Sequence, residues 1–126
     1  MRERNGKAMD IIFNNSLGQI TVDPKIVAEV AGAVACKCYG VAGMASKNTK
    51  DGIVSLLRPD SVGRGVNVTV GENGVLVELH IVIQFGLNIN STCESIVHRV
   101  RFTLEGKMGL PVKCINIKVD GVRVSE

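Results

Sequence analysis

The stretch that decides the fold is Val75-Leu-Val-Glu-Leu-His-Ile-Val-Ile-Gln-Phe85. Its odd-numbered residues are all apolar, whereas Glu78, His80 and Gln84 occupy even positions. Because successive side chains of a β-strand point to opposite faces of a sheet, this period of two predicts a long strand. We expect one face of the strand to be buried and the other to meet water or a partner.

A turn and a second strand precede this stretch. Gly71-Glu-Asn-Gly74 contains an Asn-Gly pair, which is the strongest short signal for a β-hairpin, and residues 65–70 alternate between valine and polar residues. The same Gly-x-x-Gly letters occur in the loop with which KH domains clamp phosphates, but that loop joins two helices. This segment, which lacks Lys and Arg, is therefore predicted to be a turn between antiparallel strands.

A helix and a short strand are predicted further upstream. Asp23 is a good N-terminal cap, and Pro24 suits the first helical position because its missing N–H would have no partner there. Apolar residues then recur at helical spacing to about Gly40. The alternating segment Gly18–Asp23 predicts a strand leading into this helix.

A second helix and a final strand follow the long strand. Ser91-Thr-Cys-Glu94 matches a capping box, which predicts a helix that runs to about Lys107. Residues 112–124 alternate again, with a kink or bulge expected at Gly121. The order βαββαβ predicts an α+β two-layer sandwich, with about four strands and two amphipathic helices on one face.

The length of 126 residues is that of one domain. Residues 1–13 are predicted to be a flexible N-terminal tail, and residues 14–126 a single α/β domain. The pattern leaves open whether Ile11–Phe13 form a short extra strand. Residues 41–65 are the least regular part of the chain, and a short helix is expected at Asp51–Leu57.

Composition limits the classes of function. Aromatic residues make up 3% of the chain and the net charge is +3, so a stacking surface for nucleic acid is disfavoured. No secretory signal and no apolar run of about 20 residues is visible, which indicates a cytoplasmic protein with free thiols. Cys36 and Cys38 would point apart on a helix, and the spacing of the four cysteines predicts no metal site. No cofactor is expected.

Glu78 and His80 are candidates on the open face of the long strand. They lie two residues apart, which suggests an acid–base pair, but general acid–base catalysis needs a pocket that excludes water. A flat sheet face offers no such pocket, so a surface for a partner or a second copy is favoured over an active site. Other polar residues expected on this face are Thr21, Asn67, Thr69 and Lys118.

Two further groups are candidates for contact with partners. Val41, Gly43 and Met44 form a segment of small and adaptable residues after the first helix, although the same residues also suit a simple turn and packing. His98, Arg99 and Arg101 form a basic edge on the second helix, which would suit a phosphate, an acidic partner or anionic lipid. The alternative is a solvated helix face balanced by nearby glutamates.

The order of several segments resembles one protein family. Gly18-Gln-Ile-Thr-Val-Asp-Pro24, Tyr39-Gly-Val-Ala-Gly-Met44, the hairpin at Gly74 and Val112-Lys-Cys-Ile-Asn-Ile-Lys-Val-Asp-Gly-Val122 together are similar to the alkaline-shock and general-stress proteins of Gram-positive bacteria. The resemblance covers roughly residues 15–124. It implies a small cytoplasmic or membrane-associated protein without known enzymatic activity, which acts through protein–protein contacts, and it supplies no catalytic residues.

The function expected from residues and resemblance is that of a non-enzymatic interaction or scaffold module linked to envelope or alkaline stress. Protein partners are expected, among them a membrane-anchored protein or a second copy, at the cytoplasmic side of the membrane. Two alternatives stay open. An RNA-binding module shares the βαββαβ order, and a regulatory domain for a small ligand or lipid would use an opening near residues 41–65.

Overall fold

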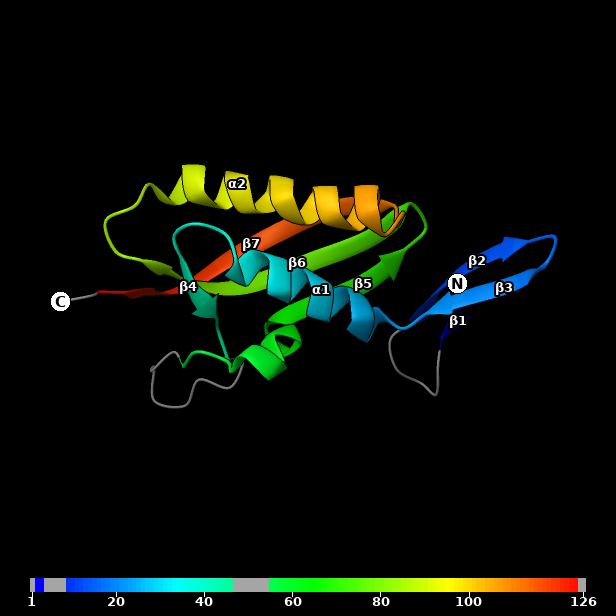
Figure 1. Ribbon diagram of the computed structural model, residues 1–126, viewed down its shortest axis with the longest axis horizontal. Helices are drawn as coiled ribbons and strands as arrows, with labels where there is room; N and C mark the ends of the chain where they lie inside the picture. Colours follow the sequence, from blue (N-terminus) through cyan, green and yellow to red (C-terminus); the bar gives the residue numbers. More distant parts are fainter. Residues whose placement is uncertain (1, 4–8, 47–54, 125–126) are drawn as a thin grey trace.

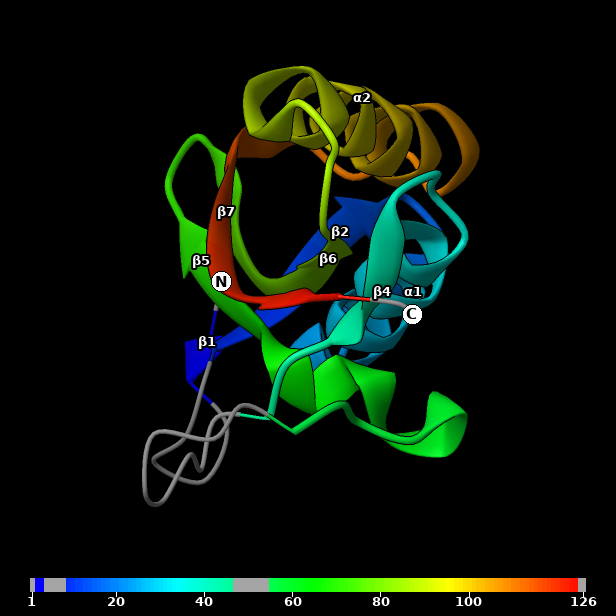
Figure 2. The ribbon, with the colours of Figure 1, turned by 90° about the vertical axis from the view of Figure 1, so that its left-hand side faces the viewer.

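The computed structural model describes residues 2–3, 9–46 and 55–124. Two helices lie against one face of a mixed sheet, which confirms the predicted α+β sandwich of two layers (Figures 1 and 2). The elements are β1 (Arg2–Glu3), β2 (Met9–Asn15), β3 (Gly18–Val22), α1 (Pro24–Cys36), β4 (Val41–Met44), the 3-10 helix η1 (Pro59–Gly65), β5 (Val66–Gly71), β6 (Gly74–Gln84), α2 (Ile89–Arg101), the π-helical turn η2 (Phe102–Lys107) and β7 (Val112–Arg123).

Strand β6 is the centre of the four-stranded sheet. Residues 74–79 pair with β5 and residues 81–83 with β4, both antiparallel, so β4 and β5 lie end to end along one edge of β6. Along the other edge, residues 75–84 pair with β7 in the parallel direction. The crossover between these parallel strands is α2, as a parallel connection requires.

The predicted first strand lies outside this sheet. Segment 18–22 forms an antiparallel hairpin with β2, and this hairpin projects from the end of the molecule opposite the C-terminus (Figure 1). The fourth strand of the main sheet is instead β4, in the segment predicted to be irregular. Its alternation was not recognisable because it has four residues, two of which, Ala42 and Gly43, are poor strand formers.

Two other local predictions need correction. Strand β2 begins at Met9, so residues 9–13 belong to a strand rather than to the predicted tail, and Ile11 is fully buried against the core. The helix expected at 51–57 lies partly outside the described residues. Its described part is extended, because Leu56 pairs with Ala45 in an antiparallel bridge.

Both helices begin at capping residues. The carboxylate of Asp23 accepts a hydrogen bond from the Lys25 N–H at 2.9 Å, as predicted. Helix α2 begins three residues earlier than the capping box suggested, because the side chain of Asn88 accepts from the Ser91 N–H at 2.9 Å. Asn caps a helix about as well as Ser, so the earlier residue takes this role.

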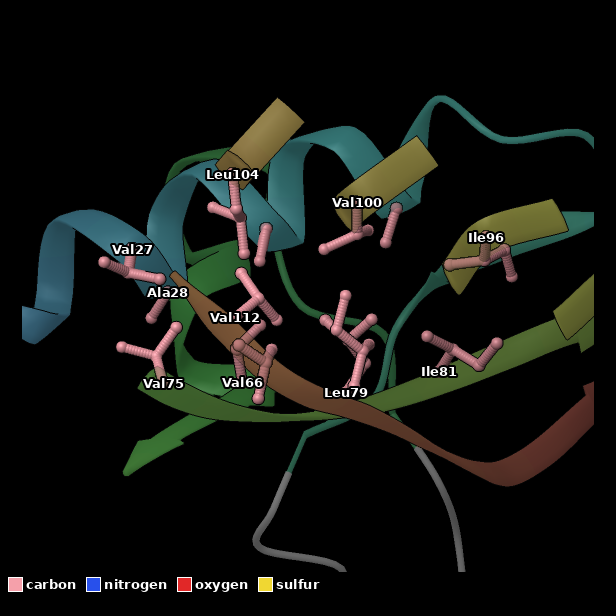
Figure 3. Packing of buried hydrophobic residues seen from close by; sticks show 14 of the residues in the cluster. Val27, Ala28, Val66, Val75, Leu79, Ile81, Ile96, Val100, Leu104 and Val112 are labelled. Atoms are coloured by element: carbon pink, nitrogen blue, oxygen red, sulfur yellow. The ribbon is translucent and has the colours of Figure 1, made fainter. Parts of the chain in front are cut away.

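The core lies between the helices and the odd-numbered face of β6 (Figure 3). Every odd residue from Val75 to Ile83 is at most 1% exposed, and burial of such a side chain contributes about 2 kcal/mol. Phe85 continues the row and was predicted to be buried, but it is 66% exposed. The residues that contribute from the helices are Val27, Ala28, Ala31 and Ala35 of α1 and Ile96 and Val100 of α2.

Candidate functional site

A cluster of five polar side chains occupies the face of the sheet that the helices leave open. The ring of His80 lies between two carboxylates, with Nδ1 2.8 Å from Oδ2 of Asp120 and Nε2 2.9 Å from Oε2 of Glu78. Asn67 donates to the same Glu78 oxygen at 2.9 Å. Lys118 Nζ lies 3.7 Å from the other Glu78 oxygen. We call these five residues the polar cluster.

Strand register and a bulge position the polar cluster. Asn67 of β5 lies opposite Glu78, and Lys118 of β7 lies opposite His80. The pairing then shifts between Val119 and Gly121, so that Asp120 is the extra residue of a bulge. Bulges redirect side chains, and this one allows the Asp120 carboxylate to reach His80.

Hydrogen bonding determines the electrostatics of the polar cluster. Both carboxylate contacts of the His80 ring are satisfied together when both ring nitrogens carry a hydrogen. The hydrogen bond from Asn67 is the main cause that lowers the pKa of Glu78, followed by His80 and, more weakly, the charge of Lys118. The network therefore joins three strands, with a neutral donor from β5 and the opposite charges of Glu78 on β6 and Lys118 on β7.

Most residues of this cluster share a face that the sequence pattern predicts. Glu78, His80, Asn67 and Lys118 were predicted to share the open face, and the structure brings them together. Asp120 was not among the residues predicted for this face, although the bulge predicted at Gly121 was a usable signal. Thr21 does not belong to this face, because it lies in the β2–β3 hairpin.

A groove of roughly 650 Å³ adjoins the polar cluster. Its lining comes from α1, η1 and the strands β5 to β7, and it combines valine side chains with polar groups. Among the latter are Lys25, Asn67, Thr69, Glu78 and Asn116. A partner that binds here would therefore meet both a groove and charged side chains.

The segment of Val41, Gly43 and Met44 serves packing to a larger extent than predicted. Met44 is fully buried in the core, so its side chain cannot form the exposed contact that the sequence suggested. A Cβ at Gly43 would lie 3.2 Å from Cδ2 of Leu56, which shows that the small residue makes room for this leucine. Val41 is half-buried, and its role in binding stays a prediction.

The basic edge of α2 has two side chains exposed to solvent and one that contacts the sheet. His98 and Arg99 are exposed, and His98 Nε2 lies 4.0 Å from the carboxylate of Glu94. Arg101 turns toward β7 instead, where Nη1 donates to the Val112 carbonyl at 3.1 Å. Arg101 therefore links α2 to the sheet, which leaves a narrower basic edge than the sequence indicated.

All four cysteines are free, and burial raises the pKa of Cys36, Cys38 and Cys93. The Cys38 thiol donates to the Val34 carbonyl at 3.4 Å. Within residues 2–3, 9–46 and 55–124, no three His, Cys, Asp or Glu side chains are grouped so that they could hold a metal ion.

Exposed aromatic rings form a feature that sequence reasoning missed. Of the four aromatic residues in the chain, Tyr39, Phe85 and Phe102 are 84%, 66% and 65% exposed. The available signal was that Phe85 ends an apolar row just before Gly86. Exposed aromatic side chains are enriched where proteins bind one another.

These features define a small two-layer α+β protein with an ordered polar cluster on an open sheet face. The chain belongs to the Asp23 family, whose described function is cell envelope-related, and the family model matches residues 13–124. The family name denotes a protein and is unrelated to residue 23 of this chain.

Relatives in two bacterial species support this membership. The uncharacterized protein YloU of Bacillus subtilis is 36% identical over 118 residues, which cover 93% of this chain and 98% of the relative. A stress response regulator gls24 homolog of Streptococcus pyogenes is 30% identical over 86% of this chain and 61% of its own length. No solved structure matches the chain. The predicted link to an envelope and stress-response family is therefore confirmed.

None of the helices in the described part of the chain is long and apolar enough to cross a membrane. The relatives carry descriptions as uncharacterized proteins or as stress response regulators.

Proposed function

We propose that this chain is a non-enzymatic interaction module, a scaffold of the envelope stress response, which binds a protein partner on its open sheet face. One observation carries the proposal, namely the polar cluster that joins β5, β6 and β7. The cellular setting comes from the family, whose function is cell envelope-related. On this proposal the protein acts on the cytoplasmic side of the membrane, beside a membrane-anchored partner.

The polar cluster is preorganised for recognition. Its side chains already hold one another in place. When a partner binds, these side chains therefore lose less conformational entropy than mobile side chains would. The carboxylates of Glu78 and Asp120 both contact the His80 ring, and Glu78 also lies beside the Lys118 ammonium. Such a pattern favours a partner with complementary charges and rejects others.

The RNA-binding alternative has weaker support from this face. An RNA-recognition sheet stacks bases on aromatic rings of its central strands. On the open face of β6 the corresponding residues are Leu76, Glu78, His80, Val82 and Gln84. The small-ligand alternative expected an opening near residues 41–65. Among the described residues of that segment, the groove reaches only Gly63, and its mixed apolar and polar lining suits a peptide side chain better than an apolar molecule.

A crosslinked pull-down of the tagged chain from alkali-stressed native cells, with and without nuclease, tests the proposal. We use Asn116→Arg, which adds a long cation to the exposed open face, and Ser95→Arg as the control, because Ser95 is an exposed neutral residue of α2. The proposal expects protein partners that survive nuclease, that are lost with Asn116→Arg and that are kept with Ser95→Arg. Partners that depend on intact RNA, or that are indifferent to Asn116→Arg, would overturn it.

A further inference from the structure

A second surface lies where the buried face of the sheet runs past the two helices. On this face Ile83 is fully buried, whereas Phe85, two residues further along the same row, is 66% exposed. Strand β7 runs alongside, with Val122 opposite Ile83, and Val122 and Val124 are 50% and 67% exposed. The apolar face thus continues beyond its helical cover.

Helix α1 ends and helix α2 begins beside this uncovered part of the sheet. The Gly40 carbonyl accepts from the Gln84 N–H at 2.8 Å, which places the turn after α1 beside the end of β6. Gly40 has a φ of 89°, and a Cβ there would lie 2.5 Å from Cδ1 of Leu87, so the turn requires glycine. Tyr39 of this turn and Ile89 at the start of α2 are both exposed.

We name Tyr39, Phe85, Ile89, Val122 and Val124 the apolar end, because the backbone segments that carry them meet around the end of β6. Its backbone is fixed, since the Phe85 N–H donates to the Arg123 carbonyl at 2.9 Å and ties the two strands together. Large side chains gathered on rigid elements, with two aromatic rings among them, match the composition of binding hot spots.

Charge around the apolar end indicates the kind of partner. Lys37 precedes Tyr39 by two residues, and Arg123 lies between the two exposed valines. Arg99 lies near enough to Cys38 to oppose the rise in the thiol pKa that burial causes. Against these three cations stands Glu94, in the second turn of α2.

We propose that the apolar end binds a segment of another protein that carries apolar side chains flanked by Asp or Glu. A second copy of this chain fits less well. A pair of exposed apolar side chains, Leu17 and Ile20, lies at the β2–β3 hairpin, and residues 11–22 contain no charged residue that would complement the cations. This surface is separate from the polar cluster and goes beyond the function proposed above.

Selection from a random peptide display library on the purified full chain tests this inference, followed by fluorescence anisotropy with the enriched peptide. We expect enriched peptides to be rich in Asp, Glu and large apolar residues. Phe85→Ala should weaken their binding by about tenfold, as hot-spot residues do. Phe102→Ala is the matched control, because this ring is equally exposed but follows the far end of α2, about 20 Å from Ile89. Arg123→Glu should weaken binding as well, and Asn116→Arg should not.

Three other outcomes would overturn the inference. The first is that no acidic peptides are enriched, or that enriched peptides bind Phe85→Ala as tightly as they bind the wild type. The second is a dimer in light scattering that Phe85→Ala dissociates, which would assign the surface to a second copy. The third is Phe85-dependent binding to vesicles of phosphatidylglycerol and phosphatidylcholine without peptide binding, which would assign it to lipid. Asn116→Arg tests the open face alone. If the inference about the apolar end fails, the proposed function of the open face still stands. If the proposed function fails, the inference about the apolar end still stands.

Discussion

The polar cluster and the apolar end differ in what holds their side chains. In the polar cluster, His80 and Glu78 are bound by neighbouring side chains, so the cluster contributes to the folded state without a partner. At the apolar end, the Phe85 ring is exposed to water. It contributes favourable free energy only when a partner covers it and removes its apolar surface from water. The first surface is therefore coupled to folding, whereas the second is free to serve binding alone.

The same contrast separates the covered and uncovered parts of the apolar row, and it predicts the largest effect. Leu79→Ala should lower the free energy of unfolding by about 3 kcal/mol, because it removes a fully buried side chain and leaves a cavity. Phe85→Ala should change it by less than about 0.5 kcal/mol, as is usual for exposed sites. Urea unfolding followed by circular dichroism measures both values. A large loss with Phe85→Ala would show that the apolar end is part of the core.

The polar cluster should yield an intermediate effect. His80→Ala leaves two carboxylates near one another without the ring between them, and we expect a loss of about 1 kcal/mol, typical of hydrogen bonds at a partly exposed site. His98→Ala is the control, because His98 is exposed and has one distant carboxylate neighbour. If urea unfolding gave equal values for the two variants, the cluster would not contribute to folding.

The contrast between the two surfaces also explains what the sequence could predict. Period-two alternation from Val75 to Ile83 identified the central strand, and the polar residues at even positions identified the open face, because both follow from the geometry of one strand. The same rule assigned Phe85 to the core. Alternation tells which face a side chain lies on, but the extent of the cover depends on where α1 and α2 end in space.

Pairing between distant segments accounts for the other differences. Segment 18–22 has the pattern of a strand and is one, but its partner is β2 rather than β6, and its own alternation contains no information on that choice. Strand β4 joins the main sheet through three pairs with residues 81–83, too few to leave a pattern. Asp120 reaches His80 through a bulge, which a glycine at position 121 indicated only in general terms.

The smallest expected effect concerns pH and sharpens the view of the polar cluster as a charge network. The pKa of Glu78 is lowered from 4.5, first by the hydrogen bond from Asn67. A carboxyl whose pKa is lower in the folded state stabilises the fold above its unfolded pKa, and this contribution is lost as the pH falls through the folded value. Stability should therefore decline more in the wild type than in Glu78→Gln as the pH is lowered below 4.5.

Asn67→Ala identifies the source of this dependence. The variant removes the leading cause of the lowered pKa, so its deficit in unfolding free energy relative to the wild type should be greatest at neutral pH and should shrink as Glu78 becomes protonated. Urea titrations across the acid range follow the deficit, which should be a few tenths of a kcal/mol because the site is partly exposed. A deficit that is constant with pH would mean that Asn67 stabilises the strand independently of the Glu78 charge, and the polar cluster would then be a set of local contacts rather than a network.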